Sequence, residues 1–114
     1  MWAYEFNDET APVPGPAYLT LNFPMGAYHG GDVQYLLNRV PPSPYALNGT
    51  QQMFSQAMIS YWARFARKGN PNSKAEPHWR PYVSRIDDRQ SFISSTPTVE
   101  SSADFDSLHM CTSY

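Results

Sequence analysis

The sequence predicts an α/β fold, and three observations indicate it. Residues 2–6 alternate large aromatic residues with small or charged ones, which is the period-two pattern of a strand. Residues 50–68 repeat apolar side chains at the spacing of one helical face. Residues 91–95 and 98–100 have the composition of two short strands. We therefore expect a strand, a short helix, a long helix, one or two short strands and a C-terminal helix, in that order.

The expected first strand places Trp2, Tyr4 and Phe6 on one face. Three large aromatic side chains need a surface to pack against, which the frayed end of a chain does not supply. Residues 7–25 follow with four prolines, which prevent a helix and discourage a central strand. The short apolar piece 18–23 within them favours an ordered connection over a loose linker.

Composition excludes several classes of function. The 114 residues are enough for one small domain with a modest core. The net charge of −2 gives no electrostatic reason to expect nucleic acid or an anionic membrane surface as partner. No apolar run approaches the roughly 20 residues of a membrane span. No signal-peptide pattern is visible, which leaves the localisation open.

A glycine-flanked loop over residues 26–32 presents His29. Glycines adopt backbone angles that other residues avoid, and they let other groups approach closely. Asp32 stands where a helix could start, and carboxylates are favoured there. This pattern suits a histidine that reaches a substrate from a loop anchored by the next helix. The alternative is a turn that happens to contain a histidine.

The long helix over 50–68 has clear boundary signals. Asn48-Gly49-Thr50 fits both a glycosylation acceptor and a helix entry with Asn48 or Thr50 as N-cap, and we favour the cap because the periodic segment follows at once. Gly69 is placed to end the helix in the left-handed conformation, and Pro71 prevents its continuation. We expect its apolar face to be core rather than a ligand-binding surface. That face comprises Met53, Phe54, Ala57, Met58, Tyr61, Trp62 and Phe65.

The remaining segments are shorter. Residues 70–90 are expected to form a loop, with Trp79 and Tyr82 holding it to the body of the protein. Residues 103–111 are expected to form a C-terminal helix with Ser102 as its N-cap. The sequence contains no internal repeat and no low-complexity tract.

Together these motifs resemble the C-terminal portion of the type B carboxylesterases, which include the cholinesterases and bacterial para-nitrobenzyl esterases. The matching motifs keep the family's order over nearly all 114 residues. They are a late strand with a Tyr-x-Phe segment (2–6), the loop Gly-x-x-His-Gly-x-Glu/Asp (26–32), the signature Tyr-Trp-x-x-Phe-Ala-x-x-Gly-x-Pro-Asn (61–72) and a Pro-x-Trp-Pro-x-Tyr loop that here carries Arg80 (77–82). Met110-Cys111 is similar to the family's Cys-x-Phe-Trp ending, from which residues 112–114 depart.

The resemblance implies an α/β-hydrolase fold, with residues 1–114 as an incomplete C-terminal part of that domain. It also places the strand 2–6 inside a parallel sheet with neighbours on both edges. In this fold class a serine on a Gly-x-Ser-x-Gly turn attacks the ester carbonyl. A histidine takes and returns the proton, a carboxylate orients the imidazole, and backbone N–H groups stabilise the oxyanion.

His29 matches the histidine of that triad. Because no Gly-x-Ser-x-Gly occurs in the sequence, we expect the serine and the acid in a missing N-terminal portion. The chain alone is then expected to be inactive. Asp32 is not expected to be the acid, because the family's matching carboxylate is not the triad member. The expected substrate of the complete enzyme is a small ester, with no cofactor; which ester is undetermined.

Two alternatives stand beside this interpretation. The chain could be a stand-alone, non-catalytic interaction module derived from an esterase C-terminus. His29, His78, His109 and Cys111 could hold a metal, but their separations match no ligand spacing, and His78 and His109 are more simply surface or loop residues. Cys111 is the only cysteine, so it either pairs with a cysteine elsewhere, as in some family members, or is a buried free thiol.

Overall fold

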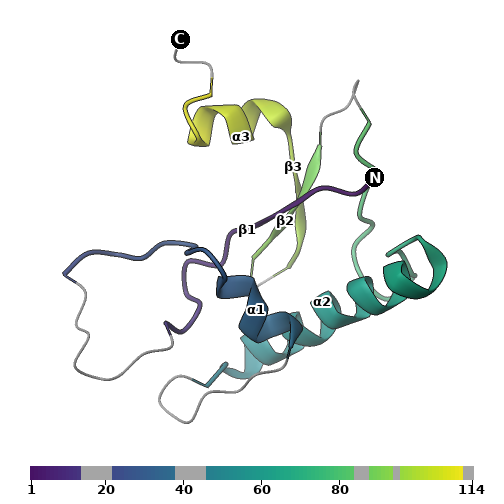
Figure 1. Cartoon of the computed structure of the whole chain (residues 1–114), viewed down its shortest axis with the longest axis horizontal. Coiled ribbons are helices and arrows are strands. Elements are labelled where there is room, and N and C mark those ends of the chain that lie inside the picture. Colours follow the sequence, from purple (N-terminus) through teal and green to yellow (C-terminus); the bar gives the residue numbers. More distant parts are fainter. Residues whose placement is uncertain (14–21, 38–45, 84–87, 94–95, 112–114) are drawn as a thin grey trace.

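A small mixed sheet lies between helices on both of its sides (Figure 1). The computed structural model describes residues 1–13, 22–37, 46–83, 88–93 and 96–111. The elements follow one another as β1 (Tyr4–Phe6), α1 (Gly31–Leu36), α2 (Gly49–Lys68), β2 (Arg89–Phe92), β3 (Thr98–Glu100) and α3 (Ser102–Leu108). α1 and α2 lie on one side of the sheet and α3 on the other, which confirms the α/β class.

The sheet has the order β1-β2-β3. β1 pairs with β2 in parallel, with Phe6 opposite Phe92. β2 pairs with β3 in antiparallel, with Arg89 opposite Glu100. Within the described ranges β1 has a partner strand on one edge only, where the family resemblance places neighbours on both. Parallel pairing of β1 and β2 is possible because a long crossover, which includes α1 and α2, joins them.

α2 begins one residue before the predicted 50–68 helix, and β2 and α3 also begin earlier than predicted. The strand expected at 91–95 starts at Arg89, and residues 94–95 lie outside the described part of the chain. α3 starts one residue before the predicted 103–111 helix and ends at Leu108. Its N-cap is Ser101, not Ser102, because the Ser101 hydroxyl accepts a hydrogen bond from Asp104 N at 3.2 Å. The apolar piece 18–23 falls mostly outside the described ranges.

The start of α2 confirms the predicted N-cap and assigns it to Asn48 and not to Thr50. The Asn48 side chain accepts from Gln51 N, and the Gln51 side chain accepts from Asn48 N, both at 3.0 Å. This reciprocal pair is a capping box, which satisfies two backbone donors that a helix start leaves free. At the other end Gly69 has φ 68° and donates to Phe65 O at 2.7 Å. A residue with a Cβ would be strained at that φ.

One face of the sheet is aromatic and packs on α2. Phe92 of β2 is fully buried at its centre. Its ring centroid lies 5.3 Å from that of Trp79, 5.6 Å from that of Trp62 and 5.7 Å from that of Tyr61. Phe54, Met58 and Tyr61 of the predicted apolar face are buried, as expected, and Trp62 packs against them. Burial of each such side chain contributes about 1.5–3 kcal/mol. Met53 and Phe65, which were also predicted to be core, are exposed.

The opposite face of the sheet is charged and lies beneath α3. Glu5, Arg89 and Glu100 come from the three strands, and register places them on the same face. The Arg89 guanidinium lies 3.6 Å above the centre of the Phe105 ring. His109, the C-cap residue of α3, lies with its Nε2 2.7 Å from Glu5 Oε1. The C-terminal helix is thus held to the sheet chiefly by polar contacts.

Candidate functional site

His29 lies on an exposed loop immediately before α1. Gly26 has φ 58° and Gly30 has φ 80°, so the flanking glycines take the left-handed conformation that the sequence pattern suggested. Gly30 is the N-cap residue of α1 and makes no side-chain cap. Among the described residues none forms a hydrogen bond or ion pair with the His29 imidazole. Its ring nitrogens are therefore open to groups from elsewhere.

The residue before His29 is tied to the segment that follows β1. Tyr28 OH donates to Pro12 O at 2.7 Å. Gln34 Nε2, from α1, lies 2.9 Å from both Pro12 O and Tyr28 OH. Three polar groups from separate parts of the chain therefore close a triangle beside the loop that presents His29.

The segment after β1 is itself held in place by a buried carboxylate. Asp8 is only 3% exposed. Its Oδ2 accepts from Tyr35 OH at 2.6 Å, and its Oδ1 accepts from the Thr10 backbone and hydroxyl. Burial, and then the bonded Asp8 carboxylate, raise the pKa of Tyr35 well above its usual value, so the phenol stays a donor. Gln51 of α2 also donates to Thr10 O at 2.9 Å.

The sequence reasoning missed Asp8, which it treated as part of a proline-rich loop. A local signal was present. An Asp whose side chain bonds the backbone two residues on forms an Asx turn, a tight and ordered structure. The bond from Thr10 N to Asp8 Oδ1, at 3.0 Å, is of this type. Its partnership with Tyr35 had no local signal, because those residues are 27 positions apart.

Asp32 lies in the first turn of α1, as predicted for a carboxylate near a helix start. It also makes a contact that the sequence did not indicate. Tyr4 OH, from β1, donates to Asp32 Oδ2 at 3.0 Å. Burial, and then the negative charge of Asp32, raise the pKa of Tyr4. Asp32 thereby joins the start of α1 to the sheet.

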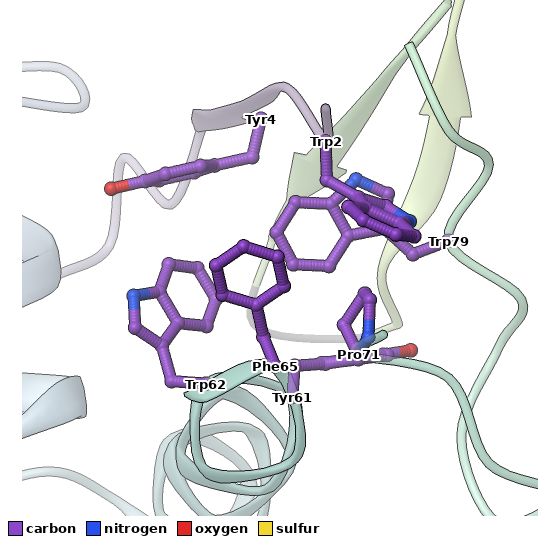
Figure 2. A pocket seen from close by; sticks show the side chains of 7 residues that line it. All are labelled: Trp2, Tyr4, Tyr61, Trp62, Phe65, Pro71 and Trp79. Carbon is purple, nitrogen blue, oxygen red and sulfur yellow. The ribbon is translucent and has the colours of Figure 1, made fainter. Parts of the chain in front are cut away.

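A separate aromatic pocket of about 140 Å³ lies between β1, the C-terminal half of α2 and the loop after it. Figure 2 shows that rings form most of its wall and that the Tyr4 hydroxyl points away from the other labelled side chains. Its lining residues are Trp2, Tyr4, Tyr61, Trp62, Phe65, Pro71 and Trp79. It lies beside the start of β1, whereas His29 comes after the end of that strand. None of these lining residues belongs to the His29 loop, although Tyr4 also bonds Asp32 at the start of α1.

None of the other candidate residues forms a hydrogen bond or ion pair with His29 in the described part of the chain. His78 is exposed, and His109 contacts Glu5 beneath α3. Cys111 is exposed, which contradicts the alternative of a buried thiol. In the described part of the chain no three histidine, cysteine, aspartate or glutamate side chains come close enough to hold a metal ion. None of the described helices has the length and apolarity needed to cross a membrane.

This arrangement of strand, loop and helices is found in a solved esterase. The structure of PNB esterase superposes on 95% of this chain and 20% of its own, with a TM-score of 0.66 and 19% sequence identity. At that identity the likeness concerns the fold alone. It shows that the chain forms a portion of an α/β-hydrolase fold.

Sequence comparison gives the family. The model of the carboxylesterase family matches residues 1–110, so the chain belongs to the carboxylesterase family. Bile salt-activated lipase of Mus musculus is 34% identical over 82 residues, which are 69% of this chain and 13% of that protein. Cocaine esterase of Homo sapiens is 36% identical over 56 residues, 48% of this chain and 10% of that protein. The chain thus spans little more than a tenth of the length of these relatives.

Proposed function

We propose that His29 is the general base of a serine carboxylic ester hydrolase whose nucleophile and acid lie in an upstream part of the polypeptide. The observation that carries this proposal is the His29 loop. In a chain of the carboxylesterase family, an exposed imidazole with no partner among the described residues sits between a sheet strand and a helix start. Residues 1–114 are then the C-terminal part of the α/β-hydrolase domain.

In this mechanism the serine hydroxyl attacks the ester carbonyl while its proton passes to one ring nitrogen of His29. The imidazolium that forms returns the proton to the departing alkoxide, so that an alcohol leaves and an acyl-enzyme remains. Water repeats the sequence and releases the acid. The second ring nitrogen of His29 donates to the upstream carboxylate, which stabilises the imidazolium. The substrate class is a small carboxylic ester.

The test is the His29→Ala variant of the complete polypeptide, assayed with a short-chain chromogenic ester. We expect kcat to fall by about 10⁴- to 10⁶-fold with little change in KM, because the lost group acts in the transition state. His78→Ala is the matched control, since this exposed histidine lies in a different loop. Asp32→Asn should lower kcat far less, because Asp32 lies in the first turn of α1 and bonds Tyr4 and not the His29 imidazole.

Other outcomes would contradict this proposed function. Full activity in His29→Ala would refute the assignment. A complete polypeptide with no Gly-x-Ser-x-Gly and no esterase activity would favour the stand-alone, non-catalytic interaction module. The isolated 114-residue chain should hydrolyse the ester no faster than a surface histidine does.

A further inference from the structure

We infer that Tyr28 and Gln34 are positioning residues for His29, which they hold through the Pro12 carbonyl. The three groups form what we term the Tyr28–Gln34–Pro12 node. The inference rests on the proposed role of His29. It adds two residues that neither touch the substrate nor appear in the catalytic triad, yet determine where the imidazole lies.

The node closes around the loop from both ends. Tyr28 directly precedes His29, and Gln34 follows it by five residues on α1. Tyr28 OH donates to Pro12 O at 2.7 Å, and Gln34 Nε2 lies 2.9 Å from both of these oxygens. Gln34 is only 7% exposed, so water competes weakly for its amide. The backbone that carries His29 is therefore anchored on each side of the histidine.

The acceptor at the centre of the node is held in place by contacts of its own. Pro12 belongs to the segment in which Asp8 accepts from Tyr35 of α1. In the same segment Thr10 O accepts from Gln51 of α2. The segment that carries the Pro12 carbonyl is thus bonded to both helices, and it continues directly from β1 of the sheet. Because these contacts hold the Pro12 carbonyl in place, the hydrogen bonds of the node fix the His29 loop relative to the sheet and the two helices.

Packing around the loop leaves little room for adjustment. Gly31 N donates to Tyr28 O at 3.0 Å. A Cβ at Gly31 would lie 2.9 Å from Phe6 Cε1 and 3.5 Å from Tyr28 Cζ, so the Tyr28 and Phe6 rings enclose the glycine. Removing the Tyr28 hydroxyl keeps this ring packing. It deletes only the hydrogen bonds, which makes Tyr28→Phe a clean probe of the node.

The expected effect follows from the steep dependence of the proton-transfer rate on the distance between the reacting groups. A misplacement of a catalytic group by about 1 Å can cost about 100-fold in rate. In the complete polypeptide we expect Tyr28→Phe to lower kcat by about tenfold, with KM within about twofold of the wild type. Gln34→Met retains length but lacks the donor, and should lower kcat at least as much. A loss confined to kcat is expected because the node affects the reacting geometry and not substrate contacts.

Tyr61→Phe is the matched control. Tyr61 OH also donates to a proline carbonyl, that of Pro77, but in the aromatic core. This substitution removes the same kind of bond and should lower the melting temperature while leaving kcat within about twofold. Melting temperatures of all variants, measured beside their kinetics, separate lost stability from lost positioning.

The outcomes distinguish this inference from the proposed function. If His29→Ala abolishes activity but Tyr28→Phe and Gln34→Met keep the wild-type kcat, the positioning role is wrong and the general base stands. If Tyr28→Phe and Tyr61→Phe lower kcat equally, the node only supports folding, and the inference fails. Activity retained in His29→Ala overturns the proposed function and this inference with it.

Discussion

The two faces of the sheet are stabilised by different physical interactions. On the α2 side, Phe92 and Trp79 are buried among edge-to-face rings, whose attraction depends little on pH or salt. On the α3 side, Glu5, Arg89 and Glu100 share one face. α3 itself has no buried residue among those described. The first face therefore contributes most of the free energy of unfolding, whereas the second carries the groups that make this free energy depend on pH.

The charged face gathers carboxylates in a partly desolvated space. Burial, followed by the hydrogen bond and charge of Glu5, raises the pKa of Glu100 to about 7, although Arg89 and His109 act in the opposite direction. The Oε2 atoms of Glu5 and Glu100 are buried and have no hydrogen-bond donor among the described residues when both groups are ionised. A proton on Glu100 supplies a donor for this pair and removes the repulsion between two charges.

The largest expected effect is on the aromatic face. Trp79→Ala should lower the free energy of unfolding by about 3–5 kcal/mol, because it leaves a cavity among packed rings. Trp79 is 5% exposed, and its Nε1 donates to Ala3 O at 2.9 Å, so the variant also loses a bond to the start of β1. Urea unfolding measures the change. Val99→Ala is the control, since Val99 is 44% exposed, and it should stay within about 0.5 kcal/mol. Equal losses in the two variants would contradict a special contribution of the packed rings to stability.

The next effect is a pH dependence on the charged face. Because the folded-state pKa of Glu100 lies above its ordinary value of 4.5, the folded protein binds this proton more tightly than the unfolded chain. The stabilisation is complete below about pH 4.5 and is lost as the pH rises to about 7. It amounts to the order of 1–3 kcal/mol.

Glu100→Gln tests this dependence. The variant keeps a donor and cannot ionise, so its stability relative to the wild type should increase between about pH 5 and 7 and then level off. Chemical unfolding at several pH values from 4 to 8 gives the comparison. Glu9→Gln is the matched control because Glu9 is exposed, and it should leave the curve unchanged. Parallel curves for Glu100→Gln and the wild type would show that Glu100 titrates normally.

The smallest expected effect is the loss of stability when an N-cap is removed, and it can be compared between the two covering helices α2 and α3. Asn48→Ala removes the capping box of α2 and should cost about 1 kcal/mol. Ser101→Ala removes the cap of α3 and should cost less, because that helix buries no residue and can fray without exposing the core. Unfolding by urea, followed by circular dichroism, gives both values. A larger loss in Ser101→Ala would place α3 within the stable core.

Elements with local signals were predictable. The cap at Asn48, the apolar stripe and Gly69 all lie in or beside α2, so the sequence indicated that helix nearly residue by residue. The glycines around His29 likewise identified a glycine-flanked loop before a helix. The predicted start of β2 was two residues too late, because a short apolar run has no sharp boundary of its own and pairing with β1 and β3 decides where the strand begins.

By itself the sequence determined the class of fold, the long helix and the loop that presents His29, since each depends on backbone preferences and periodicities within about 20 residues. Only the tertiary structure decided which polar groups meet. Asp8 forms a hydrogen bond with Tyr35, Gln34 forms one with Pro12 across 22 positions, and His109 forms one with Glu5 across 104. No local pattern encodes such pairs, because hydrogen bonds and ion pairs between distant residues depend on strand register and helix placement, which the packing of the aromatic core sets.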